Sequence, residues 1–181
     1  MWNTDVWCFV DIKYTSWKGW FDMDSEKLKV YTARITQANR SELVVITFDL
    51  IIESIEEAKK SLEAADYIIY EKELKRVQKL LNELMGSLDH RFPIAKDLFQ
   101  LYSFANRRVV VALFEKKPEL LDNVISIMEK LRVGFEGVAK EDTSGPVMGN
   151  TQKLYAGLTY GKHALDEVFV NVNEATRGFK A

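Results

Sequence analysis

The side chains of this sequence that could carry out chemistry are few and scattered. There are two histidines, His90 and His163, and one cysteine, Cys8. Helical proteins that hold paired iron or manganese ions use Glu-x-x-His pairs, but Ser87 and Tyr160 stand three residues before the two histidines. The H-E-x-x-H zinc pattern, a phosphate-binding glycine loop, the G-x-S-x-G turn and a Cys–His pair with a plausible third member are also missing. We therefore expect no enzyme, no metal site and no cofactor.

Two polar residues stand out from their surroundings. Asp49 lies within an apolar helix face, where it either pairs with an Arg or Lys of the fold or holds a polar group of a partner. His90 lies in D-H-R-F-P, between two leucine-rich segments, and we interpret it as a solvated turn residue.

Composition narrows the class of protein. The chain has 181 residues, of which 47% are hydrophobic and 29% charged, as in ordinary soluble domains. Its formal net charge of −2 offers no basic field for nucleic acid. No apolar run reaches the ~18 residues of a membrane span, and the single cysteine fits a reducing compartment. We expect a cytoplasmic protein without membrane insertion.

Four long segments carry apolar residues three and four positions apart, the period of amphipathic helices. The first begins after Asn39-Arg40-Ser41, where Asn39 or Ser41 can cap it. The third begins at Pro93, which fits the first position of a helix. The apolar seams run over 44–65, 70–88, 94–114 and 121–138. With short turns between them, they predict an all-α, antiparallel four-helix bundle.

The two ends of the chain differ from this bundle. Residues 1–30 form an N-terminal arm that contains all four tryptophans, and residues 141–181 form a linker and a C-terminal tail. Residues 1–22 are either a leader that docks its aromatics on the bundle or poorly ordered upstream sequence, with Met23 as the true start. The tail has a short helical stripe of Leu165, Val168, Phe169 and Val172. The tail either docks on the bundle or becomes ordered only when a partner binds. As a hypothesis, it competes with the partner for a groove of the bundle.

Two helices are more apolar than a bundle requires. At about 100° per residue, Leu43, Ile46 and Leu50 lie opposite the seam of the first helix. The third helix has the same excess in Phe99, Val110 and Phe114 and should be the most enclosed of the four. Either the arm or tail covers these side chains, or the third helix is simply central. The functional alternatives are a groove for an amphipathic partner helix and a homodimer interface.

Several motifs, taken in order, resemble a known family. They are S-E-L-V-V-I-T-F-D-L, E-L-M-G-S-L-D, I-A-K-D-L-F-Q-L-Y, A-N-R-R-V-V-V-A, L-L-D-N-V and E-K-L-R-V-G-F, over residues 31–140. This series resembles FliS, the flagellin-specific export chaperone of bacterial flagella. The family's Tyr-Asp-Gly segment appears as Phe48-Asp49-Leu50, and its usual tryptophan near the end of the fourth helix is Phe135.

The resemblance implies a cytoplasmic bundle that binds the disordered C-terminal segment of flagellin and keeps it from polymerising early. It also implies presentation of that segment to the flagellar type III export gate. In the family a segment ahead of the first helix, here around Tyr31 to Ala38, can lie over the groove and be displaced. We therefore expect partner contacts at Tyr31, Leu43, Ile46, Leu50, Phe99, Val110 and Phe114. The alternative is a structural bundle that self-associates through its extra apolar faces.

Overall fold

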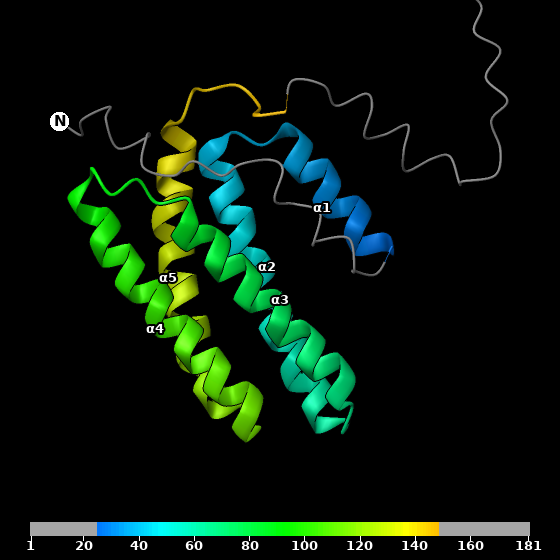
Figure 1. Ribbon diagram of the computed structural model, residues 1–181. Helices are drawn as coiled ribbons and strands as arrows, with labels where there is room; N and C mark the ends of the chain where they lie inside the picture. Colours follow the sequence, from blue (N-terminus) through cyan, green and yellow to red (C-terminus); the bar gives the residue numbers. More distant parts are fainter. Residues whose placement is uncertain (1–24, 149–181) are drawn as a thin grey trace, which may run out of the picture. The chain divides into compact units, whose positions relative to one another are not determined.

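The computed structural model describes residues 25–148, which contain five helices and no strand (Figure 1). These helices are α1 (Ser25–Gln37), α2 (Arg40–Glu63), α3 (Tyr67–Gly86), α4 (Pro93–Glu115) and α5 (Glu119–Glu141). The predictions for the tryptophan-rich leader, Cys8, Met23, His163 and the C-terminal stripe lie outside the described residues.

Helices α2 to α5 form an antiparallel four-helix bundle, as the sequence predicts. Each packs against the helices that precede and follow it, and α5 closes the bundle against α2. Figure 1 shows the chain reversing direction at each short turn, with α1 lying outside the bundle beside α2. This arrangement follows from four amphipathic helices of similar length whose connections are too short for any other neighbours.

The helix starts are defined by local side chains. Asn39 caps α2 in a reciprocal capping box: its Oδ1 accepts from the Glu42 N–H at 2.8 Å, and the Asn39 N–H donates to the Glu42 carboxylate at 2.8 Å. Asp66 caps α3 by accepting from the Ile69 N–H at 3.1 Å. Pro93 occupies the start of α4, where no N–H is needed. The predicted capping by Asn39 and the start at Pro93 are confirmed.

The turns end the helices where the sequence predicts. Lys116 adopts the left-handed conformation, with φ of 52°, and so stops α4 before Pro118. In the turn between α3 and α4, His90 is exposed, which confirms its assignment as a turn residue. Arg91 hydrogen bonds to Asp89 across the same turn and lowers the pKa of Asp89 to about 2.

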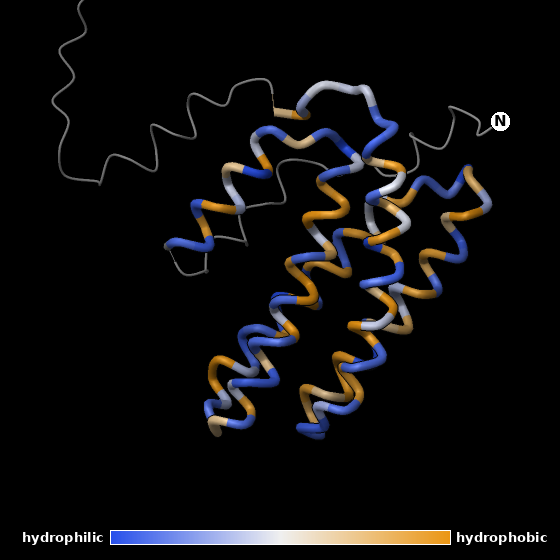
Figure 2. The backbone as a smooth tube through the Cα atoms, turned by 180° about the vertical axis from the view of Figure 1, so that it is seen from behind, coloured by the Kyte–Doolittle hydropathy of each residue, from blue (hydrophilic) through white to orange (hydrophobic). Residues whose placement is uncertain are grey.

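The core follows the predicted seams. Figure 2 shows hydrophobic residues recurring along each helix between hydrophilic ones, the pattern that buries one face. The fully enclosed side chains come from all four bundle helices and include Phe48, Ile55, Leu81, Tyr102 and Met128. Phe48 contacts the ring of Phe135 edge-on, with centroids 5.4 Å apart. Two positions that carry the family resemblance are therefore packing neighbours.

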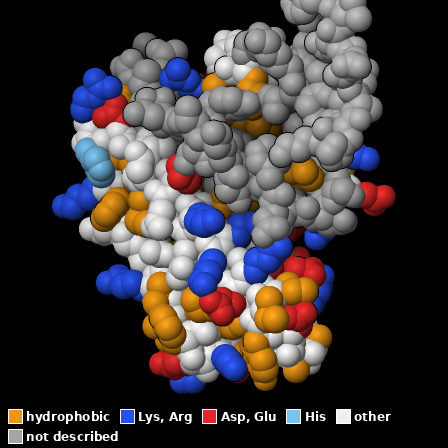
Figure 3. All heavy atoms as spheres, turned by 45° about the vertical axis from the view of Figure 1, so that its right-hand side comes forward, with side chains coloured by type: hydrophobic (Ala, Val, Ile, Leu, Met, Phe, Trp, Pro, Cys, Tyr) orange, Lys and Arg blue, Asp and Glu red, His pale blue; other side chains and the backbone are white. Residues whose placement is uncertain are grey.

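The prediction that the third bundle helix is the most enclosed is wrong. That helix is α4, and it buries one face only, whereas α2 buries side chains on two. The reason is the number of neighbours: α2 packs against α1, α3 and α5, whereas among the helices of residues 25–148 the main neighbours of α4 are α3 and α5. The apolar excess of α4 therefore faces outward, and hydrophobic side chains reach the surface of the described bundle (Figure 3).

Helix α1 is an element that the sequence analysis did not predict. It begins at Ser25 and continues past residue 31 to Gln37. Leu28, Tyr31 and Ile35 stand three and four residues apart, which is the available signal. At 13 residues the segment is about the minimum length for a helix in water, so its helical state depends on packing against α2.

Candidate functional site

The outer face of the first half of α2 is apolar and buried, and α1 lies beside it. Leu43, Ile46 and Leu50 belong to the same buried cluster as Tyr31 and Ile35 of α1. Leu50 is only 2% exposed, although it lies opposite the bundle core. Tyr31 and Ile35 lie outside the arm of residues 1–30; they belong to the segment around Tyr31 to Ala38, which the resemblance placed ahead of the first bundle helix. We call these five residues the α1–α2 contact.

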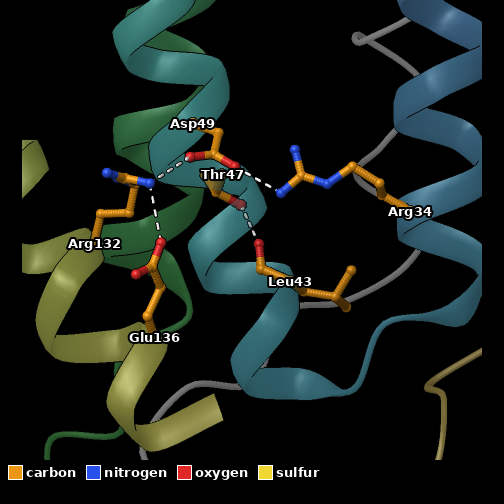
Figure 4. A network of polar contacts seen from close by, with 6 residues as sticks. All are labelled: Arg34, Leu43, Thr47, Asp49, Arg132 and Glu136. Atoms are coloured by element: carbon orange, nitrogen blue, oxygen red, sulfur yellow. Dashed lines mark hydrogen bonds and ion pairs between the residues drawn. The ribbon is translucent and has the colours of Figure 1, made fainter. Parts of the chain in front are cut away.

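A polar network holds α1 beside this contact (Figure 4). Arg34 of α1 donates to Asp49 of α2 at 2.6 Å, and Arg132 of α5 lies 3.7 Å from the other oxygen of the same carboxylate. Arg132 also donates to Glu136 at 2.9 Å. Asp49 thus pairs with arginines of the fold, which confirms the first interpretation of this residue. Because Arg34 is substantially exposed, its ion pair alone contributes at most about 1 kcal/mol.

Tyr31 combines both kinds of contact. Its ring is buried in the cluster, and the Arg34 guanidinium lies 5.5 Å from its centroid. Burial raises the pKa of the Tyr31 hydroxyl above its usual range, and the hydrogen bond to Glu53 of α2 raises it further. The neutral hydroxyl is therefore the form that favours docking of α1.

An open cavity lies next to the α1–α2 contact. Its volume is about 450 Å³, and it is formed by the end of α1, the start of α2 and the end of α5. Ile46 lines it and so borders both the cavity and the covered patch. The lining mixes apolar and charged side chains: Arg34, Gln37, Ala38, Glu42, Val45, Ile46, Glu136, Ala139 and Lys140.

The chain after α5 is joined to the α1–α2 corner. Asp142 accepts from the Ser41 hydroxyl at 2.8 Å, and its backbone carbonyl accepts from the Asn39 side chain at 3.3 Å. Farther along, the Val147 N–H donates to the Ala38 carbonyl at 3.1 Å. Although burial opposes the shift, hydrogen bonds from Ser144 and Ser41 lower the pKa of Asp142. The connection between α1 and α2 is therefore hydrogen bonded at two points to the segment that follows α5.

The structure divides the seven predicted partner contacts into two groups. Tyr31, Leu43, Ile46 and Leu50 are all buried and belong to the hydrophobic core cluster, on the side where α1 lies beside α2. The three α4 residues lie elsewhere: Phe99 and Phe114 are exposed, and Val110 is partly buried. The sequence analysis missed Ile35, Arg34 and Arg132, because their roles depend on a helix it did not predict and on pairing across the bundle.

The described residues offer no other obvious chemistry. Among residues 25–148, no three His, Cys, Asp or Glu side chains come together as a metal site would need. None of the helices in that range has the length and apolar character needed to cross a bilayer. The fold and the site define a helical bundle protein with a second buried apolar face on α2 and exposed hydrophobic side chains on α4.

Comparison with known families identifies the particular kind of bundle. A family model described as flagellar protein FliS matches residues 26–142, more than half of the chain. The chain belongs to the FliS family, which is a family of flagellar export chaperones rather than enzymes. The match extends from α1 to Asp142, the residue that joins the end of α5 to the start of α2. No curated protein matches the chain.

Proposed function

We propose that this protein is a cytoplasmic chaperone that binds the C-terminal segment of flagellin, prevents its premature polymerisation and presents it to the export gate. The observation that carries the proposal is the apolar patch of Leu43, Ile46 and Leu50 under α1. A bundle helix needs one apolar face, and this second one is covered by a helix that is too short to be stable alone. Such a cover can be exchanged for another amphipathic helix.

Helix α1 and an amphipathic helix of flagellin can replace each other because both would make the same kind of apolar contact with α2. Flagellin ends carry apolar stripes that pack in the filament and aggregate unless they are covered. A disordered segment that folds in the groove loses ordering entropy, which keeps its net affinity moderate. Release at the export gate then needs no nucleotide hydrolysis by the chaperone.

The polar network supports repeated exchange. When α1 leaves, Asp49 loses Arg34 but keeps Arg132, which lies 3.7 Å away on α5. The carboxylate therefore stays compensated in the open state, and no unpaired buried charge opposes opening. Phe99, Val110 and Phe114, the other predicted contacts, lie on α4, which packs against α3 and α5 rather than beside α1.

Titration calorimetry with the full chain and a peptide of the C-terminal segment of the cognate flagellin tests this function. We expect an equimolar complex and a negative heat-capacity change, since apolar surface is buried. A matched peptide with its apolar stripe replaced by serine should not bind. Absence of binding by the native peptide, or equal binding by both peptides, would refute the proposal. A stable dimer in light scattering that excludes the peptide would favour self-association instead.

A further inference from the structure

An apolar stripe on α4 is exposed along the side that faces α3. Phe99, Val110 and Phe114 stand eleven and four residues apart, so they share one side of the helix. Phe99 is 43% exposed and Phe114 79% exposed. Ser103 lies between them, and its hydroxyl contacts Met85 Sδ of α3 at 3.5 Å, which places the stripe beside that helix. We call Phe99, Val110 and Phe114 the α4 stripe.

The bundle does not need the α4 stripe. Helix α4 already buries a complete face against α3 and α5, made of Ala95, Leu98, Tyr102, Ala105, Val109 and Ala112. At 1.5 Å per residue the stripe extends over about 22 Å, or four turns of a partner helix. Between Phe99 and Val110, this side of α4 carries the polar Ser103 and Asn106, so the stripe has one exposed aromatic side chain at each end. Exposed aromatic side chains at both ends of one helix face are typical of a contact with another protein.

The charges beside the α4 stripe are basic. At about 100° per residue, Lys96 and Arg107 lie on the same side of α4 as the stripe. Both are exposed, and neither forms an ion pair with another residue of the range 25–148. The acidic residues of α4, Asp97 and Glu115, point about 130° away from the middle of the stripe. Only cations of α4 therefore border this surface.

The end of the stripe is basic and aromatic as well. Lys116 follows Phe114 closely, and its ammonium lies 3.7 Å from the centroid of the Tyr67 ring at the start of α3. The nearest acid on that side of α3, Glu71, is paired with Lys75 at 2.5 Å. By contrast, α2 carries six acidic and three basic residues. The charged residues beside the α4 stripe are therefore basic, whereas those of α2 are mainly acidic.

We propose that the α4 stripe is a second docking surface, which binds an acidic amphipathic helix of another protein. The apolar face of that helix would cover Phe99, Val110 and Phe114, and its flanking carboxylates would meet Lys96, Arg107 and Lys116. A helix fits because the stripe follows a straight four-turn line, and an acidic one fits because the bordering charges are cations. Three cations on a chain of net charge −2 are too few to make a nucleic-acid surface.

This surface is separate from the groove proposed for flagellin. Helix α4 packs against α3 and α5, whereas α1 packs against α2. The second helix therefore binds while the flagellin segment occupies the α2 groove, so that a loaded chaperone can be recognised by another component. The proposal does not depend on flagellin binding, because it concerns different residues and a different partner.

The test uses the full chain and a designed helical peptide of about 18 residues, slightly longer than the stripe. One face carries leucines, and both flanks carry glutamates. The matched control replaces every flanking glutamate with lysine. We expect the acidic peptide to bind at least tenfold more tightly in fluorescence anisotropy, and to lose affinity as salt rises from about 50 to 500 mM.

Exposed variants locate the binding surface without disturbing the core. Phe114→Ala should weaken binding of the acidic peptide about tenfold. Arg107→Glu should reduce or reverse the preference of the chain for the acidic peptide over the basic one. Ile68→Ala is the matched control, because Ile68 is 83% exposed and, at about 100° per residue, lies opposite the buried face of α3. It should leave binding unchanged. Saturation with the flagellin peptide should also leave the affinity unchanged.

Several results would overturn the proposal. These are equal binding of acidic and basic peptides, equal effects of Phe114→Ala and Ile68→Ala, and tighter binding of a DNA oligonucleotide or anionic vesicle than of the acidic peptide. Competition between the two peptides would refute the separateness of the surfaces. A chain that binds the acidic peptide but not flagellin would instead refute the function proposed above and leave this one standing.

Discussion

Removing one apolar side chain from α1 should strengthen binding of the flagellin segment. Ile35 is 8% exposed and belongs to the buried cluster with Ile46 and Leu50. Because α1 lies outside the four-helix bundle, Ile35→Ala weakens the docking of α1 and leaves the bundle core intact. If α1 and flagellin compete for one groove, weaker docking exposes the groove more often.

The magnitude follows from the side chain that is lost. Ile35→Ala removes three buried carbon groups at about 0.8 kcal/mol each, so docking of α1 weakens by about 2 kcal/mol. Since 1.4 kcal/mol is a factor of ten in equilibrium constant, the undocked population rises by up to about thirty-fold. The apparent Kd of the flagellin peptide falls by the same factor while α1 remains mostly docked.

Calorimetry on the wild type and the variant measures this change, and Val30→Ala provides the matched control. Val30 lies on the same helix but is 59% exposed, so its removal should change the affinity little. Hydrogen exchange should show faster exchange of the α1 amides in Ile35→Ala only. Faster exchange without a gain in affinity would refute competition between α1 and flagellin. A loss of affinity would instead place α1 within the binding surface.

Three further predictions concern the polar contacts. Asn39→Ala removes the capping box of α2 and should lower the unfolding free energy by about 1 kcal/mol in urea titrations; an unchanged midpoint would contradict the capping role. Asp49→Asn leaves two arginines without their shared carboxylate, so α1 amides should exchange faster, and an unaltered rate would count against the network. The lowered pKa of Asp142 means that its contribution to stability is present above its ordinary pKa and lost as pH falls through the folded value. Below about pH 4 the corner contacts of the wild type should weaken, while Asp142→Asn should show no such acid step; identical pH profiles would exclude this role.

The positions of α2 to α5 could be predicted because their signals are local. Asn39, Pro93 and Pro118 stand at helix boundaries, and the apolar seams repeat with helical period. Helix α1 could not be predicted on the same grounds. It is short, and residues such as Val30 and Thr32 are β-branched and lower its helical preference. It forms because α2 offers a surface to pack on.

The candidate site shows the same division between local and long-range information. The apolar excess of α2 and α4 is visible in the sequence, and both were expected to meet a partner or a cover. Yet Leu50 is buried under α1, whereas Phe114 is exposed at the far end of α4. The sequences of α2 and α4 do not distinguish Leu50 from Phe114, because the difference is whether another helix packs against that face.

By itself, the sequence determined the helices of the bundle, their turns and the family resemblance, since caps, periodicity and motif order depend on residues close together in the chain. The tertiary structure alone decided which apolar face is covered and which is free. It also decided that Asp49 meets arginines from α1 and α5. Burial and ion pairing depend on residues that are distant in the chain and adjacent only after folding, so local patterns do not specify them.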